Sequence, residues 1–265
     1  YGSESVESAE VLDRLGVMYY RLGMDIEAAT YCDSGLVMRE KLLGKDHLQV
    51  GWSCLNLGRV VAKLGYYSDA EAFCVRGMDI IGGEFGAKSL EMSECLEAFG
   101  FVLYYRDENA SAESLYVEAL NIRRERLGAN HPEVATLLLR IANAYRYMNR
   151  FEQAESLFTE ALEIRRSVYG ESHPEVAEVW YYLGLLMALH VMDPDRGLRC
   201  YAEASDILEI RLGETNPSFV AVKNKVATTL SANGRYPEVV NILNRLDFVM
   251  SQKYGPEHPQ LLNLV

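Results

Sequence analysis

The stretch EALEIRRSVYGESHPEVA, residues 160–177, joins the end of one segment at Gly170 to the start of another at His173 and Pro174. The same arrangement recurs along the chain, with spacings of 42, 42, 42, 43 and 42 residues between Gly44, Gly86, Gly128, Gly170, Gly213 and Gly255. Three residues after each glycine stands histidine, serine or asparagine, and proline follows in four cases. A fixed period over the whole chain predicts a repeat protein.

Each repeat carries two apolar stripes with helical spacing. In residues 131–170 the first stripe contains Leu138 and Ile141, and the second contains Ala154 and Phe158. The histidine, serine or asparagine before the first stripe is expected to cap a helix, which proline can begin. Small residues mark the predicted helix crossing, at Ala28, Ala70, Ala112, Ala154, Gly197 and, less strictly, Val239. Two antiparallel helices per repeat follow.

The predicted fold is all-α, a right-handed superhelical solenoid of helix-turn-helix repeats. Residues 1–265 are expected to form a single domain. Its six repeats span about 5–44, 47–86, 89–128, 131–170, 173–213 and 216–255, and residues 258–265 begin a seventh helix pair. Because a solenoid normally ends in an atypical polar cap, we expect the natural chain to continue beyond Val265.

The pattern Ile141-Ala142, Tyr145, Ala154, Phe158 and Ala161 resembles a tetratricopeptide motif. The usual period is about 34 residues, so the 42-residue repeats here need longer helices. This longer form, with HPEVA at 131–135 and 173–177, is similar to the repeats of kinesin light chain and nephrocystin-3-like proteins. Kinesin light chains usually carry paired asparagines where this chain has Leu139-Arg140, so the resemblance implies a protein-binding adaptor without implying its cargo.

Composition narrows the classes of partner and compartment. Lys and Arg number 26 against 38 Asp and Glu, and the net charge of −12 argues against nucleic acid and against an anionic membrane surface. The chain shows no run of about 20 apolar residues and no signal-peptide pattern, which argues against membrane insertion. Five cysteines without close pairs are expected to be reduced and buried, which favours an intracellular, cytoplasmic protein.

Motifs that carry catalysis are missing from the sequence. The segment Gly82–Gly86 lacks the lysine and the serine or threonine of a phosphate loop and is interpreted as a helix end. Four of the five histidines are explained as turn residues, and His190 stands alone on an apolar segment. We therefore predict a scaffold or adaptor without enzymatic activity or cofactor. The alternative is a regulatory or sensor domain of a larger chain whose enzymatic or motor-associated region lies elsewhere.

The first helices of such repeats line the concave face of the solenoid, where a partner segment would bind. The candidate peptide-binding residues are Trp52, Asn56, Arg59, Lys63, Phe101, Tyr105, Arg140, Asn143, Tyr147 and Tyr182. The cations on this stripe are Arg14, Arg21, Arg59, Lys63, Arg140 and Lys225, against Glu10, Glu94 and Glu178. This balance predicts a protein or peptide partner with acidic and aromatic residues, whereas a solvated face without function is the alternative.

Two of these cations supply a test of the groove. Arg59 and Arg140 are expected to point away from the core between the helices. Reversing both to glutamate should then abolish binding of the partner with little change in melting temperature.

Overall fold

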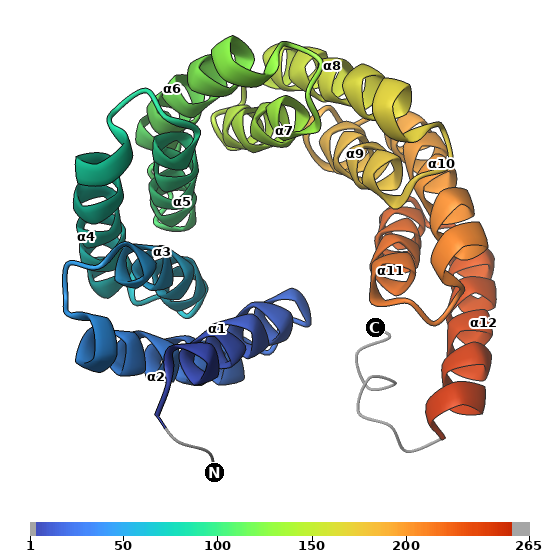
Figure 1. Ribbon diagram of the computed structural model, residues 1–265. Coiled ribbons are helices and arrows are strands. Elements are labelled where there is room, and N and C mark those ends of the chain that lie inside the picture. The colour runs from blue at the N-terminus through green and yellow to red at the C-terminus, as the bar shows by residue number, and fades with distance from the viewer. Residues whose placement is uncertain (1–3, 256–265) are drawn as a thin grey trace. The chain divides into compact units, whose positions relative to one another are not determined.

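The computed structural model describes residues 4–255, and every regular element within them is a helix (Figure 1). The predicted all-α repeat solenoid is confirmed. The chain divides between Ala144 and Tyr145 into two compact units. The predicted start of a seventh helix pair at 258–265 lies outside the described residues.

The first unit consists of helix pairs that follow one another along the chain. Its helices are α1 (Val6–Arg21), α2 (Asp25–Leu43), α3 (Leu48–Lys63), α4 (Tyr67–Phe85), α5 (Leu90–Tyr105), α6 (Asn109–Leu127) and most of α7 (Pro132–Tyr147). The helices α1, α3 and α5 each pack on the second helix of their pair, and α3 also packs against α2 and α5. Within this unit α1, α3 and α5 lie on the inner side and α2, α4 and α6 on the outer side (Figure 1).

The second unit continues the same alternation. Its helices are α8 (Phe151–Tyr169), α9 (Pro174–Leu185), the π-helix η1 (Leu186–His190), α10 (Pro194–Leu212), α11 (Pro217–Ala232) and α12 (Tyr236–Tyr254). The helix α10 packs against both α9 and α11, and α11 packs against α12. Among the described helices, none is long and apolar enough to cross a membrane.

Polar side chains cap the first helices as the sequence predicts. The Nδ1 atoms of His47, His131 and His173 accept hydrogen bonds from the backbone N–H two residues further on, at 3.2, 3.3 and 3.2 Å. Ser89 and Asn216 cap α5 and α11 through their side-chain oxygens. These bonds satisfy amide groups that have no partner inside the helix.

Small residues allow the paired helices to approach closely. The four alanines predicted at the crossing are fully buried, and Gly197 is buried as well, whereas Val239 is partly buried. On the opposite helices, a Cβ atom added to Gly100 would lie 2.6 Å from the ring of Tyr116, and one added to Gly184 would lie 2.5 Å from the ring of Tyr201. Glycine at these places therefore makes room for a buried tyrosine.

The single 43-residue repeat absorbs its additional residue in the π-helix η1. There the Val191 N–H donates to the Leu186 carbonyl, five residues back, at 3.0 Å. A π-helical turn is the usual way to insert one residue into a helix. The following turn is closed by Met192 at φ 60°, a left-handed conformation that Gly65 adopts in the second repeat.

All five cysteines are free and buried. Burial raises the pKa of the Cys32, Cys74 and Cys95 thiols to about 12 and that of Cys54 to about 11. The thiols therefore pack as small apolar groups, as the sequence predicts.

Candidate functional site

A hollow of about 180 Å³ lies between α1 and α3 in the first unit. It is lined by Val17, Tyr20, Arg21, Cys32, Asn56, Arg59 and Val60. The Arg21 side chain is exposed and forms no ion pair among residues 4–255. The Arg59 Nη2 atom donates to the backbone oxygen of Glu94 at 3.4 Å. Two guanidinium groups beside the Asn56 amide are suited to recognising a carboxylate.

Tyr20, which lines this hollow, is influenced electrostatically by residues of the other inner helices of the first unit. Burial raises the pKa of Tyr20 to about 12, while Arg140 lowers it, Tyr105 raises it and Arg59 lowers it to smaller extents. These electrostatic effects come from α3, α5 and α7. Candidate residues from three helices therefore act on one side chain of α1.

Unlike Arg21, Lys63 forms an ion pair within the first unit. Its Nζ atom lies 3.1 Å from Asp25 Oδ1 and 4.3 Å from the centre of the Tyr20 ring. The ion pair is only about a quarter exposed. Lys63 thus contributes less positive charge to the inner face than its place on the stripe suggests.

Two candidate residues are buried although the sequence places them on an exposed stripe. Phe101 is 6% exposed, because its ring packs against Tyr105 at 4.5 Å and lies under the Arg140 guanidinium at 5.4 Å. Asn143 is 9% exposed, and its Nδ2 donates to the Leu139 carbonyl at 3.0 Å, one turn earlier in its own helix. Direct contact of either side chain with a partner is therefore limited.

Trp52 and Tyr105 differ in how much of their side chains is accessible to a partner. Trp52 is partly buried and packs against the core cluster that contains Leu55 and Val102. Core packing therefore accounts for much of this tryptophan. Tyr105 is 37% exposed and offers an accessible ring on the inner face.

A buried carboxylate that sequence reasoning missed lies beneath these residues. Glu97 Oε2 accepts a hydrogen bond from Arg123 Nη2 at 2.8 Å, and Arg140 Nε lies 3.5 Å from Glu97 Oε1. Burial by itself would raise the pKa of Glu97, but Arg140, Arg59 and Arg123 together hold it below its usual value. The sequence does contain a signal for this buried carboxylate, because Asp13 and Glu97 stand at the same repeat position, two repeats apart.

This network changes the expectation for the double charge reversal. Arg140 is half-exposed, yet it also contributes to the environment that keeps Glu97 ionised. A glutamate at position 140 would place a second negative charge beside Glu97. Arg59→Glu together with Arg140→Glu is therefore expected to lower the melting temperature, in contrast to the expectation from the sequence.

Tyr147 and Tyr182, the remaining candidates, belong to the second unit. Tyr147 is 51% exposed, and its ring lies 4.4 Å from the Arg146 guanidinium and 6.4 Å from the His190 ring. His190 Nε2 lies 2.9 Å from Arg146 Nη1. Burial lowers the pKa of this histidine most, and the positive charge of Arg146 lowers it further. His190 therefore has partners that its isolated place in the sequence did not reveal.

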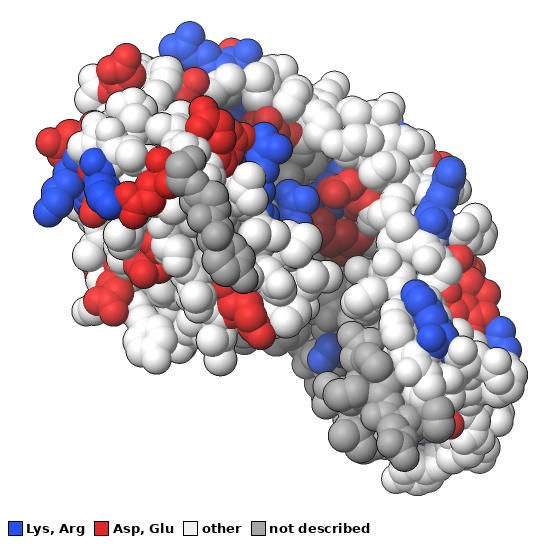
Figure 2. Space-filling view, turned by 60° about the horizontal axis from the view of Figure 1, so that its bottom comes forward, with Lys and Arg blue, Asp and Glu red and all other residues white. Residues whose placement is uncertain are grey.

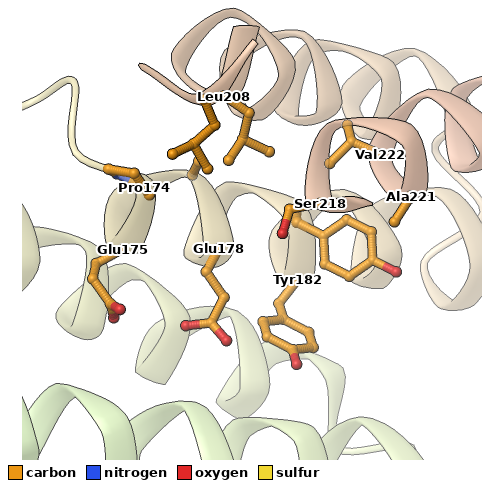
Figure 3. A pocket seen from close by; sticks show the side chains of 11 residues that line it. Pro174, Glu175, Glu178, Tyr182, Leu208, Ser218, Ala221 and Val222 are labelled. Carbon is orange, nitrogen blue, oxygen red and sulfur yellow. The ribbon is translucent and has the colours of Figure 1, made fainter. Parts of the chain in front are cut away.

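Tyr182 borders a larger hollow of about 370 Å³ between α9, α10 and α11. Figure 3 shows Glu175, Glu178 and Tyr182 following one another along one side of α9, with Leu208 and Val222 supplied by α10 and α11. The ring of Tyr182 also stacks on Phe158, with 6.0 Å between centroids. Nothing in the sequence analysis predicted this hollow.

The surface charges are mixed on the face that Figure 2 displays. Lysine and arginine side chains lie among aspartate and glutamate side chains, and neither sign forms a continuous patch there.

Within residues 4–255, no group of three histidine, cysteine, aspartate or glutamate side chains could hold a metal ion.

Family models described as tetratricopeptide repeat match residues 8–49, 91–167 and 133–191. Together these matches cover more than half of the chain. No curated protein matches the sequence.

Several solved structures share the fold at low sequence identity. BtubC (BKLC) from P. vanneervenii is 20% identical with a TM-score of 0.67, and the alignment covers 96% of this chain and 94% of that protein. The nearly identical TPR-like repeats of a putative kinesin light chain from P. anserina are 16% identical with a TM-score of 0.63, covering 78% and 98%. The Rap conjugation gene regulator of the plasmid pLS20, in complex with the Phr* peptide, is 10% identical with a TM-score of 0.67, covering 92% and 62%.

Proposed function

Because the chain belongs to the tetratricopeptide repeat family, we propose that it is a protein-interaction scaffold whose first unit binds an acidic segment of a partner protein. The observation that carries this proposal is the hollow between α1 and α3, where Arg21 and Arg59 stand beside Asn56. Its volume of about 180 Å³ suits one carboxylate side chain better than a whole cofactor.

The chemistry of the inner face supports a short extended ligand. Arginine pairs a carboxylate through two parallel hydrogen bonds, and the Asn56 amide can both donate to and accept from an extended backbone. Tyr105 offers an exposed ring for an aromatic residue of the partner. The buried positions of Phe101 and Asn143 give these two residues a supporting role.

The Rap regulator of pLS20 offers a precedent for the fold, because its structure was solved with a peptide. Its 10% identity with this chain carries no residue-level correspondence. The preference for acidic and aromatic residues rests on the side chains of this chain alone.

The test is calorimetric titration of the whole chain with a short peptide that alternates glutamate and phenylalanine. The same peptide with glutamine in place of glutamate is the neutral control. We expect the glutamate peptide to bind more tightly than the glutamine peptide. Added salt should weaken its binding modestly, because salt screens exposed charge pairs and each of these pairs contributes little. Equal affinity of both peptides would remove the case for an acidic partner.

Arg21→Gln is the sharpest variant, because Arg21 lines the hollow and stands outside the Glu97 network. An exposed charge pair contributes about 0.2–1 kcal/mol, so affinity should fall by up to about fivefold. Arg14→Gln is the matched control on the same helix, since Arg14 pairs with Glu10 and does not line the hollow. Equal losses in both variants would point to general charge attraction instead of this site.

A further inference from the structure

An arginine recurs at one position of the second helices, five residues before the glycine that ends the repeat. It is present as Arg39, Arg123 and Arg165, and all three are buried. Arg123 and Arg165 also reach the next repeat, where their Nη1 atoms donate to the backbone oxygens of Glu133 and Glu175 at 3.3 and 2.7 Å. The chain thus places its own cation where one repeat meets the next.

Arg165 shows this arrangement most fully. Its Nη2 atom lies 2.9 Å from Glu175 Oε2, and its Nη1 atom lies 2.7 Å from Glu178 Oε2. The guanidinium, 3% exposed, is held against two carboxylates of α9 that are each nearly half exposed. Part of the surface of both carboxylates therefore stays accessible.

The next junction lacks all three groups. Leu208, Ser218 and Ala221 stand where the preceding junction has its arginine and two glutamates. These smaller side chains line the hollow of about 370 Å³ between α9, α10 and α11 (Figure 3). Arginine occupies the position of Leu208 in three repeats, and Ile81 and Met250 occupy it in the other two. The hollow therefore lies where half of the repeats place an arginine of this chain.

The charges around the hollow favour a cation. Its lining includes the carboxylates Glu175 and Glu178 and contains no lysine or arginine. Arg165 neutralises one of these two charges from α8, so one negative charge remains. The other walls include the apolar side chains of Leu208 and Val222 and the aromatic ring of Tyr181.

We infer that this hollow binds an arginine side chain of a partner protein. The methylene groups of that arginine would pack against Leu208 and Val222, and its guanidinium would face Glu178 and the ring of Tyr181. Arginine suits the site better than lysine because its planar group pairs a carboxylate in two places and stacks on aromatic rings. The inference concerns the second unit and does not depend on the acidic-peptide site proposed for the first.

The probe is the tripeptide acetyl-Gly-Arg-Gly-amide, and its neutral match carries citrulline in place of arginine. Both are titrated into the whole chain while the methyl signals of Leu208, Leu212 and Val222 are followed by NMR. We expect the arginine probe to shift these signals with an affinity about fivefold or more above that of the citrulline probe. Equal shifts would show that the hollow accepts any side chain of this size, which would overturn the inference.

Two variants separate the volume of the hollow from its charge. Leu208→Arg with Ser218→Glu and Ala221→Glu copies the three groups of the preceding junction, so it should fold and lose probe binding. Glu178→Gln keeps the volume and should weaken the arginine probe about two- to fivefold while leaving the citrulline probe unchanged. Unchanged affinity for the arginine probe in both variants would also overturn the inference.

Glu171→Gln is the matched control, because Glu171 pairs with Arg166 in the same unit and does not line the hollow. It should leave binding of the arginine probe unchanged. Arg21→Gln in the first unit should do the same. Each site can therefore fail its test without affecting the other.

Discussion

The helix pairs α1–α2 and α5–α6 each contain a buried carboxylate and a buried arginine, whereas α3–α4 carries Leu55 and Ile81 at the same two positions. One repeat frame thus accepts either an ion pair or two apolar side chains. The two charged pairs also differ from each other. Their difference shows what sets the direction in which the pKa of a buried carboxylate shifts.

Asp13 has one guanidinium beside it, and Glu97 is influenced by three. For Asp13, burial raises the pKa and outweighs Arg39 and the Ser53 hydroxyl. Its Oδ1 atom is buried and accepts no hydrogen bond from the described residues. For Glu97 the combined guanidinium groups outweigh burial and lower the pKa. One arginine therefore does not compensate for the desolvation of a carboxylate here, but several do.

Glu97→Gln should have the largest effect on stability. It removes the charge that faces Arg123 and leaves that buried arginine without its carboxylate, a change that typically destabilises by ~3–5 kcal/mol. Urea unfolding followed by circular dichroism measures the loss. A change below about 1 kcal/mol would mean that Arg123 finds other acceptors, such as Glu133, 3.4 Å away.

Replacing the Asp13–Arg39–Ser53 cluster with the residues that stand one repeat later should have a smaller effect of opposite sign. The variant Asp13→Leu, Arg39→Ile and Ser53→Cys takes each residue from the position 42 residues later in the chain. Replacing a buried ion pair with packed apolar groups is neutral or stabilising by about 1–4 kcal/mol. Asp13→Leu alone is the control and should destabilise, because it leaves Arg39 unpaired. A destabilised triple variant would show that the Asp13 pair contributes net stability.

Acid titration should separate the two carboxylates by the sign of their effect. The folded-state pKa of Glu97 is lowered, so its contribution is present above the unfolded value near 4.5 and is lost as pH falls through the folded value. The folded-state pKa of Asp13 is raised, so its contribution is complete below the unfolded value near 3.8 and is lost as pH rises through the folded value. Stability relative to wild type should therefore fall with rising pH for Glu97→Gln and rise for Asp13→Asn. Parallel curves from denaturant unfolding between about pH 3 and 7 would contradict this.

Arg140→Gln should have the smallest effect on stability and sharpens the comparison. The side chain is 41% exposed, so its loss should destabilise by only about 0.2–1 kcal/mol at neutral pH. Removing one of the three cations should nevertheless raise the pKa of Glu97 toward the behaviour of Asp13. The measurement is the pH dependence of stability for Arg140→Gln with and without Glu97→Gln. An unchanged pH dependence would assign the low pKa to Arg123 and Arg59.

Much of the fold could be predicted because repetition multiplies weak local signals. The capping residues such as His47 and His173 recur at one position in six copies, and alanine recurs at the helix crossing in four of the six repeats, so several copies support each assignment. The π-helix was not predicted, although the 43-residue spacing recorded one additional residue. The spacing does not say whether that residue lengthens a loop or widens a helical turn.

The candidate site was harder to predict because helical periodicity gives the direction of a side chain but not its neighbours. Phe101 lies on the predicted stripe, yet Arg140 of a neighbouring helix covers its ring. Lys63 lies there too, yet Asp25 neutralises it from a segment 38 residues earlier. The hollow beside Leu208 lies at a junction that lacks the arginine and the two glutamates of the preceding junction, and this difference becomes visible only when the two junctions are compared position by position.

The buried thiols allow local opening of the helices to be measured by chemical labelling. A thiol reagent reacts with the ionised sulfur, and burial suppresses both ionisation and access at these positions. Cys32, Cys54, Cys74 and Cys95 lie in four successive helices of the first unit, and Cys200 lies in α10 of the second. The rate of labelling under native conditions would therefore time the opening of the helix pairs that contain these cysteines. Mass spectrometry of the labelled peptides would show which unit opens first without any introduced probe.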